Sequence, residues 1–363
     1  MAFVPTAVFP GELFDVAERY AKDSVDAAPD AGIIEQMGWA AILVPEADGG
    51  FGGRFEDLGS LIDALASRAT NLPVITRCGV TPAILSAAPS DSPAGQLRAR
   101  IAAGEVSVEF CGPLSKRESD TFPSISKTAG GLTLSGVLTD VEPSGQCSHA
   151  LLHAIDAASG QSLIVLLAAE ALRNLGEAYV TVEGRHIRSV TLEQHRISDD
   201  AILARGEAAE AMRAAGWQIA QASMATDIVC TMNYALGETV RYLQERKQFG
   251  QPLSQFQVLR HDVAKLYVTY ESCRCLLMSS LRALQDASHP SERDASFDLL
   301  GLYVREHAIE FAQAVIQLHG GMGMTQETLA ARMATRLTAL AFRFGDAGGH
   351  LKALREFQGA SVQ

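Results

Sequence analysis

The chain has 363 residues, more than the ~100–200 of a typical single domain, so we expect two or three packed units. Its formal net charge is −12 and it has no long run of Lys or Arg, so long-range repulsion argues against nucleic acid and anionic membranes as partners. Hydrophobic residues make up 47% and aromatic residues only 6%, which is typical of a soluble protein rich in Ala and Leu helices.

The sequence shows no targeting or metal-binding pattern. Residues 1–5 lack a charged region followed by an apolar one, and no window approaches ~18 uninterrupted apolar residues, so we expect a cytoplasmic protein. The six cysteines are too sparse for a disulfide scaffold, so reduced thiols are expected. Cys273 and Cys275 stand two residues apart in a helical pattern, which places them on different helix faces, and no metal site is predicted.

The N-terminal part, to about residue 105, predicts helices. Apolar residues recur at three- and four-residue spacings in four segments: 12–22, 31–38, 55–67 and 95–103. The glycine-rich segment 49–53 lies between two of them. No long strand precedes it, so we expect a turn that glycine permits rather than a phosphate-binding loop.

The middle part, from about residue 106 to residue 200, predicts strands. Short runs with alternation and β-branched residues occur at 106–110, 132–135, 163–167 and 180–182. Turn residues such as Gly130 and Gly131 separate these runs. We therefore expect a small β-domain at this point of the chain.

The C-terminal part, from residue 207 onward, predicts long helices again. One helix face is marked by apolar residues at 3, 4, 3, 4 spacing: Phe256, Leu259, Val263, Leu266 and Tyr270. The helix before it should end at Glu245 or Arg246. The whole part is typical of a four-helix bundle, and the predicted fold class is α+β, mostly α.

The first segment with chemical meaning is Arg246-x-x-Phe249-Gly250-x-Pro252-Leu253-x-x-Phe256-Gln257. An Arg at a helix end offers a planar fork to a pyrophosphate, and an aromatic ring beside it can cover an adenine or a ribose. Gly-x-Pro forces the chain out of the helix into a turn. A plain turn between helices with a surface Arg would leave the Phe-Gly-x-Pro pattern unexplained, so we predict a nucleotide-binding role.

The second segment is Gln317-x-x-Gly320-Gly321-x-Gly323, which follows an apolar helical stretch at 308–316. Its glycines allow backbone amides to approach a ligand closely, and they are equally suited to capping a helix C-terminus. Both interpretations can hold at once. His319 within this segment is interpreted as a packed or hydrogen-bonded side chain rather than a catalyst.

Together the two segments resemble the part of an acyl-CoA dehydrogenase that binds the nucleotide end of FAD. Residues 37–53 resemble a turn found early in that family, and the order α, β, α matches its architecture. The resemblance implies a helical domain at 1–105, a middle β-domain at 106–200 and a C-terminal four-helix bundle at 201–363. It assigns cofactor binding, with FAD shared across a subunit interface, to Arg246, Phe249, Gln257, Gln317, Gly320 and Gly321.

The chain departs from the family at both positions where a catalytic base is found. Counting from Gly320, the family's glutamate falls on Phe344. The second known location, counted back from Phe249, falls on Ala220, and the Arg usually beside it is Gln221. Neither Phe nor Ala can remove a proton, so no catalytic residue is predicted.

The motifs that surround the flavin ring in this family are also reduced. Residues 111–120 keep only a trace of the family's first ring-binding motif, and residues 139–143 lack the Trp of the second. The features that remain therefore serve the adenine-diphosphate end of FAD, whereas those that serve the ring and the substrate have gone.

This asymmetry resembles the subunit without the glutamate in heteromeric acyl-CoA dehydrogenases that handle bulky steroid side-chain thioesters, and residues 342–352 resemble its replacement loop. The resemblance implies a heterotetrameric flavoprotein of lipid metabolism and steroid degradation, with two copies of each chain. Its partner would be a homologous subunit with the catalytic Glu, its substrate an acyl-CoA, and its electron acceptor an electron-transfer flavoprotein.

Two alternatives remain open. In the first, a homotetramer uses a displaced base, for which the candidates are Asp346, His350, His319 and Glu210. In the second, the chain is a scaffold that binds no flavin. Arg246 and Gln317 argue against a scaffold, which has no need of them in this pattern.

Overall fold

The computed structural model describes residues 3–24, 30–115, 122–142, 147–173, 175–285, 290–343 and 347–361. The chain divides into two compact units. Unit 1 comprises Met1–Ala28, Gly59–Asn71 and Gln221–Gln363, and unit 2 comprises Pro29–Leu58 and Leu72–Ala220. No helix within the described ranges is long and apolar enough to cross a membrane.

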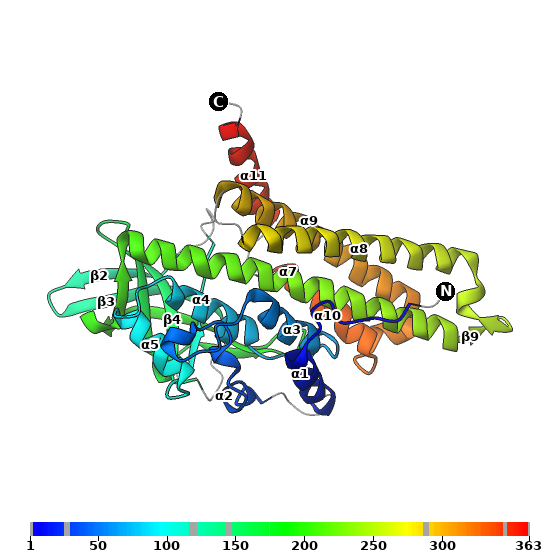
Figure 1. The fold of residues 1–363 in the computed structure, drawn as a ribbon, viewed down its shortest axis with the longest axis horizontal. Coiled ribbons are helices and arrows are strands. Elements are labelled where there is room, and N and C mark those ends of the chain that lie inside the picture. Colours follow the sequence, from blue (N-terminus) through cyan, green and yellow to red (C-terminus); the bar gives the residue numbers. More distant parts are fainter. Residues whose placement is uncertain are drawn as a thin grey trace. The chain divides into compact units, whose positions relative to one another are not determined.

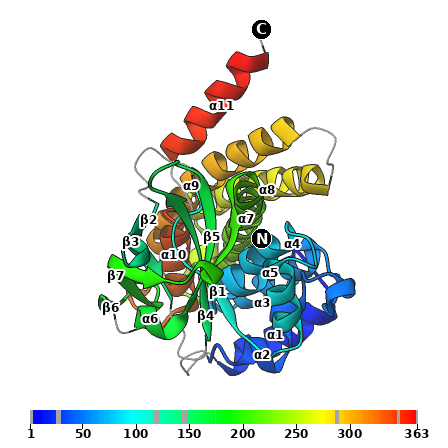
Figure 2. The same cartoon turned by 90° about the vertical axis from the view of Figure 1, so that its left-hand side faces the viewer.

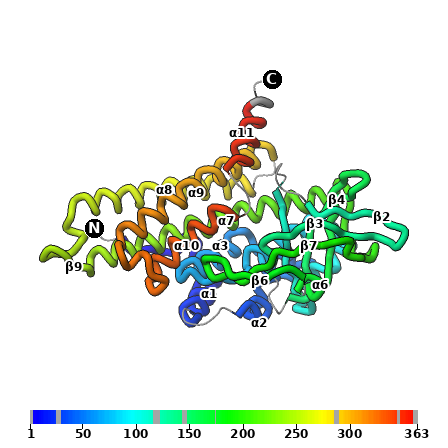
Figure 3. Tube along the Cα trace, turned by 180° about the vertical axis from the view of Figure 1, so that it is seen from behind, coloured from blue at the N-terminus to red at the C-terminus, as the bar shows by residue number. Residues whose placement is uncertain are grey.

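Unit 1 is helical. Its main elements are α1 (Glu12–Asp23), most of α3 (Phe55–Ala66) and of α7 (Gly206–Glu245), α8 (Gln257–Gln285), α9 (Pro290–His319), α10 (Leu329–Leu340) and α11 (Ala347–Ser361). The helices α8, α10 and α11 all pack against α9, and Figures 1 and 3 show α8 and α9 running side by side. The sequence predicted a four-helix bundle, and the structure adds α11 as a further helix on α9.

Short elements of unit 1 follow the C-termini of α7 and α9. The strands β9 (Lys247–Gln248) and β10 (Gln251–Pro252) form a hairpin between α7 and α8, followed by the 3-10 turn η5 (Leu253–Gln255). A second 3-10 turn, η6 (Gly320–Met324), follows α9 directly.

A buried carboxylate fixes the N-terminal segment within unit 1. The backbone N–H groups of Val8 and Phe9 donate to Asp63 Oδ2 over 2.6 and 2.9 Å. The Nδ2 atom of Asn233 on α7 donates to the carbonyl of Thr6 over 2.8 Å. Backbone groups of the segment are thus paired with side chains of α3 and α7, as buried backbone polar groups require.

Unit 2 begins with short helical elements. They are α2 (Ile33–Gln36), η1 (Trp39–Ala41), η2 (Glu46–Asp48), the π-helix η3 (Ile75–Val80), α4 (Thr81–Ser86) and α5 (Pro93–Ala102). The predicted glycine turn is confirmed, because Gly49 and Gly52 have φ values of 84° and 60° and backbone hydrogen bonds close the loop.

The rest of unit 2 is an eight-stranded sheet. Its strands are β1 (Val108–Phe110), β2 (Ser124–Thr128), β3 (Gly131–Val141), β4 (His149–Asp156), β5 (Ser162–Ala168), β6 (Glu177–Val180), β7 (His186–Ile197) and β8 (Ile202–Arg205). The order is β6-β7-β3-β2-β4-β5-β8, with β1 parallel to β4. In Figure 2, β6 and β7 lie to one side of β4 and β5. Alternating apolar residues such as Leu134, Leu138, Leu152 and Val190 form its core.

The predicted fold class, α+β and mostly α, is confirmed. The helix predicted at 31–38 is shorter, because α2 ends at Gln36 and Gly38 adopts a left-handed φ of 67°. No helix was predicted at 75–86, where η3 and α4 lie: most of these side chains are buried, so no amphipathic period marks them. The three-domain division at residues 105 and 200 stays a prediction; α5 ends at Ala102 and α7 begins at Gly206.

Candidate functional site

The hairpin that follows α7 carries Phe249 at its tip. Gln248 pairs with Gln251, so the turn has two residues, Phe249 and Gly250, with φ values of 52° and 83°. Two positive φ angles are the mark of a type I′ hairpin turn, and a non-glycine residue there costs roughly 1–2 kcal/mol. Phe249 nevertheless remains 89% exposed, with its ring edge-on to Phe256 at 6.1 Å. The chain thus holds an aromatic ring outward in a strained conformation, as a contact with another molecule would require.

The backbone of Arg246 is held on both sides of the residue. Its N–H donates to the carbonyl of Tyr242 and its carbonyl accepts from the N–H of Leu253, both over 2.8 Å. The side chain is exposed and forms no ion pair among the described residues. Gln257, also exposed, is the first residue of α8. A fixed backbone with an unpaired, exposed guanidinium suits the binding of an anion.

The glycines that follow α9 have three different roles. Gly320 has a φ of 58° and ends the helix in the left-handed conformation. A Cβ on Gly323 would lie 2.6 Å from the carbonyl oxygen of Ile316, so this glycine allows close packing against α9. Gly321 has no positive φ, and a Cβ there would meet nothing within 4 Å. Neither the conformation nor the packing of the described residues requires a glycine at Gly321, so its backbone is open to approach from outside.

Tyr242, which lies just before the first predicted segment, contacts His319 in the second. The rings of Tyr242 and His319 stack at 4.5 Å with an interplanar angle of 25°, and the Tyr242 hydroxyl donates to the carbonyl of His319 over 3.2 Å. His319 is 4% exposed, and its Nδ1–H donates to the carbonyl of Val315 over 2.8 Å. Burial lowers the pKa of His319. The interpretation of His319 as a packed and hydrogen-bonded side chain is confirmed.

All six positions predicted to bind the cofactor lie in unit 1 and are exposed. We call this set the nucleotide clamp: Arg246, Phe249, Gln257, Gln317, Gly320 and Gly321. Figure 1 shows the hairpin strand β9 at one end of the long helices. Tyr242 was not predicted from the sequence, although its position in the last turn of the helix before Arg246 was a signal that could have identified it.

The two predicted base positions differ in what the structure describes. Ala220 lies within α7 and is fully buried, and Gln221 beside it is 4% exposed. Phe344, together with the alternative base Asp346, lies outside the described residues. The described base position therefore holds a methyl group with no capacity to take a proton.

The remaining candidates for a displaced base are engaged in packing contacts. His350 is 3% exposed; its Nδ1 pairs with Asp298 Oδ1 over 2.8 Å, and its ring lies against Gly301, where a Cβ would be 2.6 Å from Nε2. Glu210 accepts from the Ser162 hydroxyl over 2.9 Å and pairs with Arg213 over 2.8 Å. These contacts hold both side chains in place within the fold.

The segment before Phe344 is held by a buried arginine. Arg305 on α9, 3% exposed, donates to the carbonyls of Ala341 and Arg343 over 3.2 and 2.6 Å. These carbonyls lie just beyond the C-terminus of α10, where backbone acceptors lack helical partners. With His350 paired to Asp298, α9 therefore anchors both flanks of the loop at which the family keeps its glutamate.

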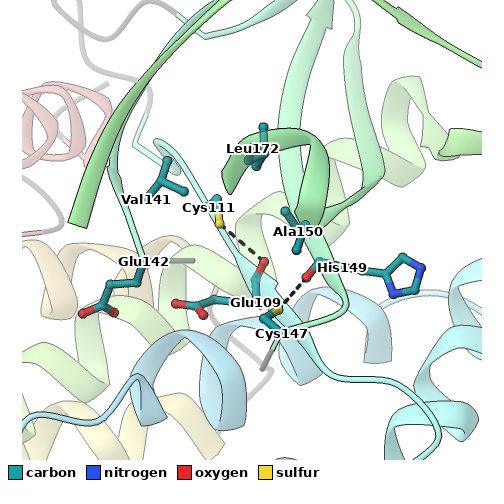
Figure 4. A pocket seen from close by; sticks show the side chains of 9 residues that line it. Glu109, Cys111, Val141, Glu142, Cys147, His149, Ala150 and Leu172 are labelled. Atoms are coloured by element: carbon teal, nitrogen blue, oxygen red, sulfur yellow. Dashed lines mark hydrogen bonds between the residues drawn. The ribbon is translucent and has the colours of Figure 1, made fainter. Parts of the chain in front are cut away.

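A small pocket in unit 2 includes residues from both ring-binding segments. Figure 4 shows Cys111 from the first segment and Val141 and Glu142 from the second, together with Glu109 and Cys147. The cavity measures about 10 Å³, at the lower limit for one water molecule. We call it the ring-side pocket. In its described part there is no room for an isoalloxazine ring.

The chain's own polar groups fill the surroundings of the ring-side pocket. Glu109 is 1% exposed and accepts from the Thr76 hydroxyl over 3.2 Å. Cys147 donates to the carbonyl of His149 over 2.8 Å. Burial raises the pKa of Cys147 to about 12 and that of Cys111 well above its usual value, so both thiols are protonated at neutral pH.

A buried arginine pairs with three carboxylates next to this pocket. Arg185 is 8% exposed and pairs with Glu142 over 2.5 Å, with Asp140 over 2.9 Å and with Glu183 over 3.4 Å. Asp140 has a positive φ of 57°. This network was not predicted from the sequence, because Arg185 is distant along the chain from Asp140 and Glu142.

The metal-site prediction concerned Cys273 and Cys275. Cys273 is buried and Cys275 is exposed, so the two thiols lie on different faces of α8. In the described part of the chain, no group of three or more His, Cys, Asp and Glu side chains is arranged to hold a metal ion.

Comparison with known proteins shows similarity to one family. Residues 212–354 match the model of the acyl-CoA dehydrogenase C-terminal domain. Acyl-CoA dehydrogenase FadE28 of Mycobacterium tuberculosis is 28% identical over 79% of this chain and 80% of its own length. Two other curated relatives align over only 30% and 31% of their own length, so for them the match spans about a third of the protein. The chain is therefore similar to acyl-CoA dehydrogenases.

Solved structures show the same fold. The ChsE4–ChsE5 complex from Mycobacterium tuberculosis includes a chain with a TM-score of 0.80, 17% identity and full coverage of both chains. A variant of the Tcur3481–Tcur3483 steroid acyl-CoA dehydrogenase gives a TM-score of 0.79 at 21% identity, over 97% of this chain and 98% of its own. The acyl-CoA dehydrogenase fold predicted from the resemblance is thereby confirmed.

Proposed function

We propose that this chain is the non-catalytic subunit of a heteromeric, FAD-dependent acyl-CoA dehydrogenase and holds the nucleotide end of FAD for a homologous partner. One observation carries the proposal. The six residues of the nucleotide clamp are exposed, and a Cβ on Gly321 would meet no atom within 4 Å. The described base position, by contrast, is the buried Ala220. A chain that lends a binding surface but supplies no base has this combination of features.

The residues of the nucleotide clamp bind different parts of the nucleotide. Arg246 pairs with the pyrophosphate, and the exposed ring of Phe249 covers the adenine. Gln257 and Gln317 offer amide hydrogen bonds, and Gly320 and Gly321 let the backbone approach the phosphates.

The reaction itself belongs to the partner subunit. When bound, FAD would supply the hydride-accepting chemistry for α,β-desaturation of an acyl-CoA, and a glutamate of the partner would supply the base for the α-proton. An electron-transfer flavoprotein would be the electron acceptor. The small ring-side pocket of this chain, about 10 Å³ among the described residues, supports placing the flavin ring in the partner.

The comparisons support a heteromer and suggest its substrate class. Both solved structures named above are complexes of two different chains by name, and one is a steroid acyl-CoA dehydrogenase. We extend this to the present chain as a cytoplasmic α2β2 heterotetramer that acts on a bulky CoA thioester, such as a steroid side chain.

The homotetramer with a displaced base gains no support from the described side chains, since His350, His319 and Glu210 are all engaged in the fold. A flavin-free scaffold leaves the strained, exposed Phe249 and the open Gly321 without a cause.

Purification of the chain alone and after co-expression with a homologous chain that carries the glutamate tests the proposal. We expect no acyl-CoA oxidation by the isolated chain, and flavin absorbance with turnover in the complex. Replacement of the partner's glutamate by glutamine should abolish turnover and leave the flavin bound. Normal turnover by the isolated, flavin-loaded chain, or a complex without flavin, would contradict the proposal.

A further inference from the structure

The Tyr242–His319 contact joins the two halves of the nucleotide clamp. Tyr242 lies in the last turn of α7, and its carbonyl accepts the N–H of Arg246 over 2.8 Å. Its hydroxyl donates to the carbonyl of His319, the last residue of α9, and the two rings stack at 4.5 Å. One side chain therefore touches the end of α9 while its own backbone holds Arg246.

The hydroxyl of Tyr242 satisfies an acceptor at a helix end. The last four carbonyls of a helix have no partner within the helix, and His319 provides one of them at the C-terminus of α9. The chain turns into the left-handed conformation at the next residue, Gly320, and leads into the open Gly321. The Tyr242 hydroxyl thus fixes the point from which the glycine turn starts.

The backbone of Tyr242 also holds that of Arg246, the first residue beyond the C-terminus of α7, because the Tyr242 carbonyl accepts the Arg246 N–H over 2.8 Å. His319 is held rigidly in turn, since its Nδ1–H is bonded to Val315 and its ring is buried.

We propose that Tyr242 is a positioning residue: its stacking and hydrogen bond with His319 set the spacing between Arg246 and Gly320–Gly321, so that both reach one nucleotide diphosphate. The inference rests on the proposed function and adds a residue that neither clamp segment contains.

Hydrogen exchange in the full-length chain without ligand tests the geometric part. Tyr242→Phe keeps the ring and removes the hydroxyl, so the fold should survive. We expect amides of residues 320–323 to exchange about fivefold faster, which corresponds to the loss of one hydrogen bond of ~1 kcal/mol. Tyr267→Phe on α8, whose ring contacts Phe3 edge-on at 5.9 Å, is the matched control and should leave these amides unchanged. Unchanged exchange in Tyr242→Phe overturns the inference.

Calorimetric titration with ADP, the tail of FAD alone, tests the functional part on the same variants. Tyr242→Phe should bind ADP about fivefold more weakly. Faster exchange with wild-type ADP affinity would show a purely structural contact and overturn the positioning role. If Arg246→Ala binds ADP like the wild type, the clamp itself is wrong; the exchange experiment distinguishes that failure, because it requires no nucleotide.

Discussion

The nucleotide clamp in unit 1 exposes its polar and aromatic side chains, whereas the ring-side pocket in unit 2 has polar side chains that are paired with other residues of the chain. In the clamp, Arg246 is exposed and Phe249 is held outward in a strained conformation. In the pocket, Glu109 and Glu142 are paired with Thr76 and Arg185, and the cavity measures about 10 Å³. Exposed groups stay available to another molecule, whereas polar groups buried in the fold are paired internally.

The strongest test of this contrast removes the charge at the centre of the pocket network. Arg185→Met leaves Asp140, Glu142 and Glu183 without their shared cation, and we expect the free energy of unfolding to fall by about 3 kcal/mol. ADP binding should be unaffected. Urea denaturation measures the loss. Arg205→Met, which removes the exposed pair with Asp199, is the control and should cost only about 0–1 kcal/mol; equal losses would show that the pocket network adds no stability beyond that of an exposed pair.

Removal of the positive charge of the clamp should weaken cofactor binding and leave the free energy of unfolding almost unchanged. Arg246→Ala takes away charge-assisted hydrogen bonds to the pyrophosphate, which are worth about 1.5–3 kcal/mol, so FAD should bind to the heteromeric complex roughly 10–100-fold more weakly. The free energy of unfolding should change by less than about 0.5 kcal/mol, because the side chain is exposed. Flavin absorbance after gel filtration reports retention. Arg274→Ala, which breaks the pair with Glu271 on α8, should retain FAD; if it loses as much FAD, the effect is one of general charge.

Two glycines of the turn after α9 are expected to differ in role: one allows close packing and the other allows ligand binding. Gly323→Ala forces a Cβ against the carbonyl of Ile316 and should lower the free energy of unfolding by about 1–3 kcal/mol. Gly321→Ala meets no atom of the chain and should change it by less than about 0.5 kcal/mol, yet weaken FAD binding because the methyl group occupies the space of the ligand. Thermal unfolding and flavin titration measure the two effects. Wild-type FAD affinity in Gly321→Ala would remove the main support for the clamp.

The smallest effect expected is a pH dependence of the free energy of unfolding that arises from His319. Burial lowers the folded-state pKa of His319, so its neutral form is favoured in the fold. The stability it supports is complete above about pH 6.5, the usual unfolded value, and is lost as pH falls through the lower folded pKa. His319→Gln should flatten this loss between pH 7.5 and 5, as measured by urea denaturation, whereas Tyr242→Phe, which keeps His319, should retain it. A wild-type profile in His319→Gln would contradict the assignment.

The site was predictable where its chemistry is local. The turn at Phe249–Gly250, the end of α7 at Glu245 and the left-handed Gly320 follow from turn and capping preferences within a few residues, whereas the positive φ of Phe249 runs against them. The loss of both base positions was likewise apparent by counting along the chain, although the structure describes only Ala220.

Other features could not be predicted because they depend on side chains from distant segments. The helical region 75–86 carries no amphipathic pattern, since it is mostly buried, and it was not predicted. The pairing of Arg185 with Asp140 and Glu142 required the strands that bring them together. His350 remained a candidate base until its contact with Asp298 was known.

The sequence by itself indicated the resemblance to acyl-CoA dehydrogenases, the two predicted clamp segments and the absence of a carboxylate at the counted base positions, because each of these depends on residue identity and short spacing. Only the tertiary structure decided that Tyr242 contacts His319, that Gly321 faces open space and that the ring-side pocket measures about 10 Å³. These properties are distances and exposures between residues far apart in the chain, and they arise only when the helices and strands pack.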